Sequence, residues 1–189
     1  MEKAINKENT LRLFVALPLK GHAAEALNQW VSTEKERLPF RKWVHAADYH
    51  ITLQFLGDVS ADKTGTLQGA LREVQAAQIE LVLSKGGAFG QPKAPRVLWS
   101  GVSGQLEGLV SLHNKIIEQT RPLGFIPEDR PFSPHITLAR NYVGKKDMPM
   151  EALASLPTGF GWTAEHFVLM RTHMHASPMY EAIGTFPLR

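Results

Sequence analysis

One four-residue string, His-Ile-Thr-Leu, occurs twice in this chain, at residues 50–53 and again at residues 135–138. Both copies alternate polar and aliphatic side chains, which is the period of a β-strand with one buried face. On such a strand the histidine and the threonine point to one face, and the isoleucine and the leucine point to the other. A purely structural strand has little reason to carry histidine on its half-polar face. The repeat therefore predicts one device built twice: an imidazole beside a hydroxyl on a rigid strand.

Together, the two devices hold the chemical groups that a phosphoryl transfer requires. Imidazole titrates near neutral pH, so one of His50 and His135 can accept a proton while the other donates one. The hydroxyls of Thr52 and Thr137 can donate hydrogen bonds to the non-bridging oxygens of a phosphate. In-line attack places the base and the acid on opposite sides of phosphorus. A pseudo-two-fold pair of these strands, facing each other across a cleft, meets that requirement.

Positive charge near the phosphate would stabilise the transition state. Arg140, which follows the second tetrad, and Arg130, in the loop before it, are the candidates, with a solvated surface arginine as the alternative for each. His173 and His175 have the spacing of a metal pair on a strand, but no third ligand stands near them in the sequence. We therefore expect these two histidines in a loop, and we predict neither a metal site nor another cofactor.

The composition limits the class of protein. A chain of 189 residues suits one compact body. It has no cysteine, which excludes disulfides and thiolate metal sites and makes the cytoplasm the expected location. No apolar run is long enough for a membrane span and no signal-peptide core is present, so we expect no membrane partner. The net charge of +3 permits a polyanionic ligand. A monomer is the expected state.

Sequence patterns predict the order of the secondary structure. Residues 1–10 are polar and expected to be a flexible N-terminus, followed by a single bilobal domain over residues 11–189. Strands are predicted at 11–17, 43–45, 48–56, 79–83, 96–102, 135–141, 167–171 and 179–184, and helices at 21–37, 60–75, 105–120 and 149–156. Gly86 and Gly87 suggest a bulge. Adjacent strand pairs favour antiparallel sheets, so the fold class is α+β with two similar halves and a tetrad strand central in each.

The chain resembles a known family. The motifs that carry the resemblance are the two tetrads, residues 12–16, residues 50–57, residues 95–99 and residues 130–140. They are similar to those of the 2H phosphoesterase superfamily and, more narrowly, of its RNA 2′,3′-cyclic phosphodiesterase branch, once called 2′-5′ RNA ligase. The resemblance covers residues 11–188, nearly the whole chain. It implies two lobes of antiparallel sheet with helices outside, a central cleft, metal-independent chemistry and RNA ends or nucleotides carrying a 2′,3′-cyclic phosphate as substrate.

The resemblance also implies roles for individual residues. It makes His50 the general acid and His135 the general base, with Thr52 and Thr137 holding the phosphate and Arg140 contacting it. It further suggests that Phe14 flanks the nucleobase by stacking; a core phenylalanine on the first strand is the alternative.

Three other functions are compatible with the residues. The same chemistry could act on another cyclic nucleotide, on ADP-ribose cyclic phosphate or on a 2′-5′ oligonucleotide. The chain could instead be an RNA-end-binding module without turnover, although two intact histidine devices argue against that. A two-histidine metal site is the third alternative.

Overall fold

A computed structural model of the protein describes residues 9–189. Within this range the chain forms nine strands: β1 (Thr10–Pro18), β2 (Phe40–Trp43), β3 (His50–Ser60), β4 (Ile79–Gln91), β5 (Ala94–Gly104), β6 (His135–Tyr142), β7 (Gly161–Ala164), β8 (His166–Thr172) and β9 (Tyr180–Pro187). The same residues form four α-helices: α1 (Gly21–Glu34), α2 (Thr64–Arg72), α3 (Leu106–Thr120) and α4 (Glu151–Ala154).

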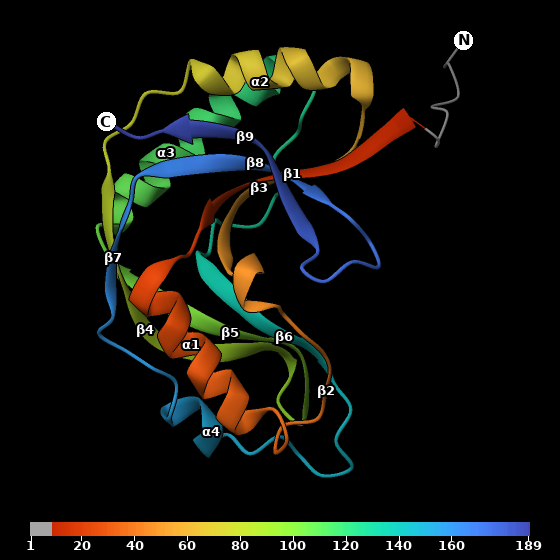
Figure 1. The fold of residues 1–189 in the computed structure, drawn as a ribbon, viewed down its shortest axis with the longest axis vertical. Coiled ribbons are helices and arrows are strands. Elements are labelled where there is room, and N and C mark those ends of the chain that lie inside the picture. Colours follow the sequence, from red (N-terminus) through yellow and green to blue (C-terminus); the bar gives the residue numbers. More distant parts are fainter. Residues whose placement is uncertain (1–8) are drawn as a thin grey trace.

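The strands build one continuous antiparallel sheet in the order β7-β4-β5-β6-β3-β1-β8-β9, with β2 added alongside β6. The sheet curls into two lobes (Figure 1), one containing β1, β3, β8 and β9 and the other containing β2 and β4 to β7. The two tetrad strands, β3 and β6, are the neighbours that join the lobes. The predicted α+β fold with two similar lobes is confirmed.

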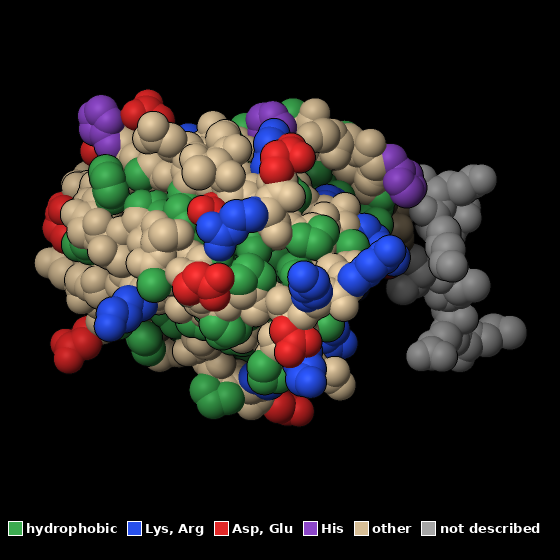
Figure 2. All heavy atoms as spheres, turned by 90° about the horizontal axis from the view of Figure 1, so that it is seen from below, with side chains coloured by type: hydrophobic (Ala, Val, Ile, Leu, Met, Phe, Trp, Pro, Cys, Tyr) green, Lys and Arg blue, Asp and Glu red, His purple; other side chains and the backbone are tan. Residues whose placement is uncertain are grey.

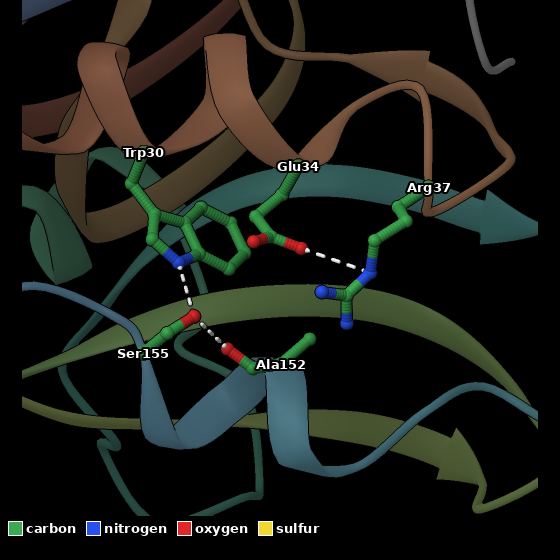
Figure 3. A network of polar contacts seen from close by, with 5 residues as sticks. All are labelled: Trp30, Glu34, Arg37, Ala152 and Ser155. Carbon is green, nitrogen blue, oxygen red and sulfur yellow. Dashed lines mark hydrogen bonds and ion pairs between the residues drawn. The ribbon is translucent and has the colours of Figure 1, made fainter.

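Each lobe is covered by a helix that follows a strand of the other lobe. α1 follows β1 of the first lobe but packs against β7 of the second, and α3 follows β5 of the second lobe but packs against α2 and β3 of the first. A polar link fixes α1 on its lobe (Figure 3): the indole Nε1 of Trp30 donates to Ser155 Oγ at 2.9 Å, and that hydroxyl donates to the carbonyl of Ala152 in α4 at 2.8 Å. On the same helix the nearly buried Glu34 pairs with Arg37 at 3.5 Å. Each half of the chain therefore stabilises the other half.

Most predicted elements form near their expected positions, with three differences. The expected short strand at 43–45 lies earlier, as β2. β7 was not predicted, because its four residues carry too little of an alternating pattern between glycines. Thr10 belongs to β1, while residues 1–8 of the predicted flexible N-terminus lie outside the described residues.

The predicted bulge is present: the register between β4 and β5 shifts between Ser84 and Gly87. Glycine is required there, because a Cβ on Gly87 would lie 2.6 Å from the indole of Trp99. The bulge thereby lets the indole of Trp99 approach the backbone of β4 at Gly87, and Trp99 pairs with Thr137 of the second tetrad strand.

On the face shown in Figure 2, positive and negative side chains are interspersed rather than gathered by sign. None of the helices in the part of the chain that the structure describes has the length and apolarity to cross a membrane.

Candidate active site

The two tetrads meet around a local two-fold axis. β3 and β6 are antiparallel, and the pair that links them joins Ile51 to Ile136, the same position of each tetrad. From the histidine onward, the first six residues of both strands have the same burial sequence: partly buried, buried, partly buried, buried, buried, exposed. The repeat seen in the sequence is therefore a repeat in space.

Each tetrad ends in a β-bulge at its leucine. In β3, Thr52 pairs with Ala16 and Gln54 pairs with Val15, which leaves Leu53 as the extra residue. In β6, Thr137 pairs with Trp99 of β5 and Ala139 pairs with Leu98, which leaves Leu138 as the extra residue. A bulge shifts the alternation by one residue and re-aims the side chains that follow it, a common device beside active sites. As a result, the third residue after each threonine is exposed.

That shift explains how Arg140 reaches the site. A strict two-residue period would place Arg140 opposite His135 and Thr137, on the core face. The bulge at Leu138 brings it to the cleft, where it lies among the lining residues together with His135 and Thr52. Its positive charge contributes to lowering the pKa of both histidines.

Both histidines are held in the same way by the backbone. The Nδ1 atom of His50 lies 2.7 Å from the carbonyl oxygen of Asp48, and that of His135 lies 2.7 Å from the carbonyl oxygen of Ser133. Since a carbonyl only accepts, each Nδ1 must carry a proton and donate it. In the neutral ring the proton-free nitrogen is then Nε2, the atom that points away from the backbone. For His50, this atom accepts from Thr52 Oγ1 at 3.0 Å.

Aromatic rings surround both imidazoles. His50 packs against Phe14 at 5.0 Å and Tyr180 at 5.2 Å between ring centroids. His135 packs against Phe89 at 5.1 Å and Trp99 at 6.1 Å. This burial lowers the pKa of His50 to about 4 and lowers the pKa of His135 below its usual value, while the hydrogen bond of each ring to a backbone carbonyl opposes the shift. In the free protein both rings are therefore neutral at pH 7.

The site opens into a cleft of about 1460 Å³. Of the residues predicted for the site, Thr52, His135, Arg140 and Arg130 line it, and His50 is joined to it through its hydrogen bond to Thr52. Thr137, two residues from His135 on β6, is partly buried.

Two predicted residues differ from the expected arrangement. The guanidinium of Arg130 is largely exposed and pairs with Glu128 at 2.8 Å, so its charge is partly neutralised. Phe14 has only 2% of its surface exposed, so its ring backs His50 and offers no open face to a nucleobase. It belongs to a small apolar cluster between β1 and β8 that supports the imidazole.

Sequence reasoning missed Asp48. Its side chain is 4% exposed, and its two carboxylate oxygens accept from the backbone N–H groups of Met179, at 2.7 Å, and Tyr180, at 3.3 Å. Its backbone carbonyl holds His50. One residue therefore fixes the imidazole and also fixes the start of β9, whose Tyr180 packs on that imidazole. A lone aspartate before a strand gives no sequence signal for a contact with residues so far along the chain.

The two histidines weighed as metal ligands lie in the loop between β8 and β9, as expected. His173 Nε2 contacts Glu181 at 2.6 Å, and His175 is exposed. Among residues 9–189, the structure places no three acidic or histidine side chains close enough together to hold a metal ion.

Comparison with known families matches this geometry. The pattern of LigT-like phosphoesterases fits the chain twice, over residues 17–99 and over residues 101–180, so each fit contains one tetrad. The chain belongs to the LigT-like phosphoesterase family. The predicted resemblance to the 2H phosphoesterases is thereby confirmed.

Several members of the family are close relatives over most of this chain. A protein of Geobacillus stearothermophilus named RNA 2′,3′-cyclic phosphodiesterase is 42% identical over 178 residues, which are 93% of this chain and 56% of the relative. One of Bacillus subtilis with the same name is 35% identical over 189 residues, or 93% of this chain and 95% of the relative. The chain thus spans little more than half of the first relative and nearly all of the second. The crystal structure of E. coli LigT complexed with 3′-AMP superposes with a TM-score of 0.78 and 28% identity, covering 95% of this chain and 98% of that one.

Proposed function

We propose that this LigT-like phosphoesterase is an RNA 2′,3′-cyclic phosphodiesterase that opens terminal cyclic phosphates to 2′-phosphomonoesters. The observation that carries the proposal is the matched pair of imidazoles, each held with Nδ1 on a backbone carbonyl around one local two-fold axis. The name shared by the Geobacillus and Bacillus relatives supports the same substrate class. The direct test is to incubate the protein with an RNA that ends in a 2′,3′-cyclic phosphate and to identify the product.

In the proposed reaction, Nε2 of His135 takes a proton from a water molecule as its oxygen forms a bond to phosphorus. The bond between phosphorus and the 3′ oxygen breaks on the opposite side, and protonated His50 gives its Nε2 proton to that oxygen. Thr52 and Thr137 donate hydrogen bonds to the non-bridging oxygens, and Arg140 offsets their growing charge. With a 5′-hydroxyl attacking phosphorus in place of water, the same steps would break the bond to the 3′ oxygen and form a 2′-5′ phosphodiester, which gives a weak ligase activity without ATP.

His50 needs a proton for this role, although its pKa in the free protein is about 4. The substrate supplies the missing charge. A phosphate anion about 4 Å from the ring stabilises imidazolium by about 4 kcal/mol at an effective dielectric constant of about 20, enough to raise the pKa by about 3. Binding of the cyclic phosphate therefore favours protonation of His50.

We expect a bell-shaped pH profile for kcat/KM with its maximum below pH 6.5. The free protein must have His50 protonated, with a pKa of about 4, and His135 neutral, with a pKa that is also lowered. The fraction in that state peaks between the two pKa values and falls tenfold per pH unit on the alkaline side. The maximum of kcat should lie at higher pH, because bound phosphate raises the pKa of His50. Steady-state kinetics from pH 4 to 9 measures both curves; a kcat/KM that rises to a plateau above pH 7 would remove the protonated acid from the mechanism.

We expect Asp48→Asn to weaken both the fold and the acid. The side-chain amide of asparagine turns an N–H toward a backbone N–H, so one buried hydrogen bond is lost. This loss should lower the free energy of unfolding by about 1–3 kcal/mol. The negative charge of the carboxylate also opposes the lowering of the His50 pKa by burial. Loss of that charge should therefore lower kcat more at pH 8 than at pH 5. Denaturant unfolding and pH profiles measure the two effects. Glu34→Gln, at another buried acid but on α1, should leave the pH profile unchanged; an Asp48→Asn defect equal at all pH values would assign Asp48 to the fold alone.

Parallel assays separate this proposal from its alternatives. Turnover of a small cyclic nucleotide or of ADP-ribose cyclic phosphate, but not of RNA ends, would keep the chemistry and change the substrate. Tight binding of RNA ends with no product over hours would support a binding module.

A further inference from the structure

The two halves of the site differ in charge. The position three residues beyond each tetrad threonine holds Arg140 in β6 and Phe55 in β3, and both side chains line the cleft. β2 extends this difference, because it pairs with β6 alongside Arg140. Within residues 9–189, no strand takes the matching place beside β3, whose neighbours are β6 and β1. The half of the site that contains β6 therefore has one additional strand next to its cation.

That additional strand places a second cation opposite the first. In the register between β2 and β6, Lys42 pairs directly with Arg140, and both residues are exposed. Residues directly opposite on antiparallel strands have Cβ atoms about 4.5–5.5 Å apart, and like charges at such a pair destabilise the sheet. The two cations therefore repel each other in the free protein and together attract an anion.

No carboxylate in the described part of the chain neutralises this pair. Among residues 9–189, neither Lys42 nor Arg140 takes part in an ion pair. The ammonium of Lys42 contacts the thioether sulfur of Met179 at 3.3 Å, and a thioether is only a weak acceptor. The carboxylate of Asp48 also contacts Met179, but it accepts from the backbone N–H. Both positive charges are thus available to an anionic ligand.

Met179 also relates Lys42 to the catalytic acid. The N–H of Met179 donates to the carboxylate of Asp48, and the backbone carbonyl of Asp48 accepts from His50. In the proposed reaction, His50 faces the 3′ oxygen. C3′ of the ribose is bonded to C4′, which carries C5′, whereas C2′ is one bond further away. The 5′ substituent of the terminal nucleotide therefore leaves the reaction centre on the side where Lys42 lies.

We propose that Lys42 binds the 5′ phosphodiester of the nucleotide that carries the cyclic phosphate. The two opposed cations then hold two successive phosphates of one RNA strand: Arg140 holds the cyclic phosphate and Lys42 holds the phosphate before it. The inference rests on the proposed function, and in particular on His50 facing the 3′ oxygen. Since a contact to phosphate carries no base information, it distinguishes an RNA end from a free nucleoside cyclic phosphate without regard to sequence.

The test compares two substrates that differ only in this phosphate. One is a nucleoside 2′,3′-cyclic phosphate with a free 5′-hydroxyl, and the other is the same nucleoside with a methyl phosphodiester at its 5′ position. The readout is the ratio of their kcat/KM values, diester over hydroxyl, because effects on the reaction centre that are common to both substrates cancel in it. In the wild-type protein the ratio should exceed one.

Lys42→Met keeps an apolar stem beside Met179 and loses the charge, so it should lower the ratio. We expect a decrease of about 3- to 30-fold, between the effect of an exposed ion pair and that of a charge-assisted hydrogen bond. Lys42→Arg should retain most of the ratio. Arg41→Met, which removes a positive charge at the adjacent position of β2, is the matched control and should leave the ratio unchanged. A wild-type ratio of one, or an equal loss with both substrates in Lys42→Met, would refute the contact and leave the proposed function intact.

Two further measurements separate the contact from a structural role. Lys42→Met should raise the midpoint of thermal unfolding at low salt, because it removes the repulsion from Arg140; a lower midpoint with an unchanged ratio would assign Lys42 to the fold. With an RNA oligonucleotide, the slope of log kcat/KM against log salt concentration should become shallower by up to about 0.7 in Lys42→Met, the contribution of one phosphate contact on a single strand. If the wild-type protein turned over none of these substrates, the proposed function itself would fail.

Discussion

Replacement of His135 by alanine is expected to lower kcat by about 10²–10⁴-fold, and replacement of His50 by alanine by a similar factor. Each change removes one of the two proton transfers, from water to His135 or from His50 to the 3′ oxygen, and the reaction needs both. The double variant should be little slower than either single one, because the two groups act as a unit. Single-turnover kinetics on a 2′,3′-cyclic phosphate terminus would measure the loss without interference from product release.

Folding should survive both substitutions. The two rings are only partly buried and lie on the cleft face of the sheet, so neither leaves a large core cavity. His22→Ala, at an exposed histidine on α1, is the control for removing an imidazole in general. Near-normal turnover by a folded His50→Ala or His135→Ala variant on every cyclic phosphate tried would exclude the paired acid–base mechanism.

The sequence was informative about the site because the tetrad is a local pattern. Periodicity alone placed His50 beside Thr52, and the structure has the same arrangement, joined by a hydrogen bond. The same rule fails beyond Leu53. Because Leu53 is an extra residue in a bulge, the alternation shifts, and a two-residue period predicts the wrong face for Phe55. Nothing within the strand marks the bulge; it arises from pairing with β1, a long-range event.

Long-range contacts also account for the other gaps. Asp48 acquires its role by accepting from backbone groups at Met179 and Tyr180, which only the closing hairpin brings near. Phe14 follows its own local pattern, but its neighbours on β8 and β9 cover it, so it supports His50 from behind. The exchanged packing of α1 and α3 likewise depends on the two lobes having already formed a common sheet.

Digestion of a nucleoside 2′,3′-cyclic phosphate to completion is expected to give the 2′-phosphate almost exclusively. The histidine pair alone does not decide this, since a two-fold arrangement allows either oxygen to leave. The difference between Phe55 and Arg140 breaks the symmetry of the cleft, so a bound nucleoside has one preferred orientation. Chromatographic separation of the two monophosphate isomers gives the answer, and a predominance of the 3′-phosphate would exchange the acid and base roles of His50 and His135.

A sulfur atom in place of the bridging 3′ oxygen would assign those roles independently of the product. A thiol has a pKa of about 8.5, far below that of a sugar hydroxyl, so a thiolate leaves without needing a proton. With this cyclic phosphorothiolate, His50→Ala should recover most of its lost rate relative to the wild-type protein. His135→Ala should recover none, because the attacking water still requires a base. Rescue of His135→Ala in place of His50→Ala would show that His135 faces the 3′ position, and hence that the nucleoside lies in the cleft the other way round.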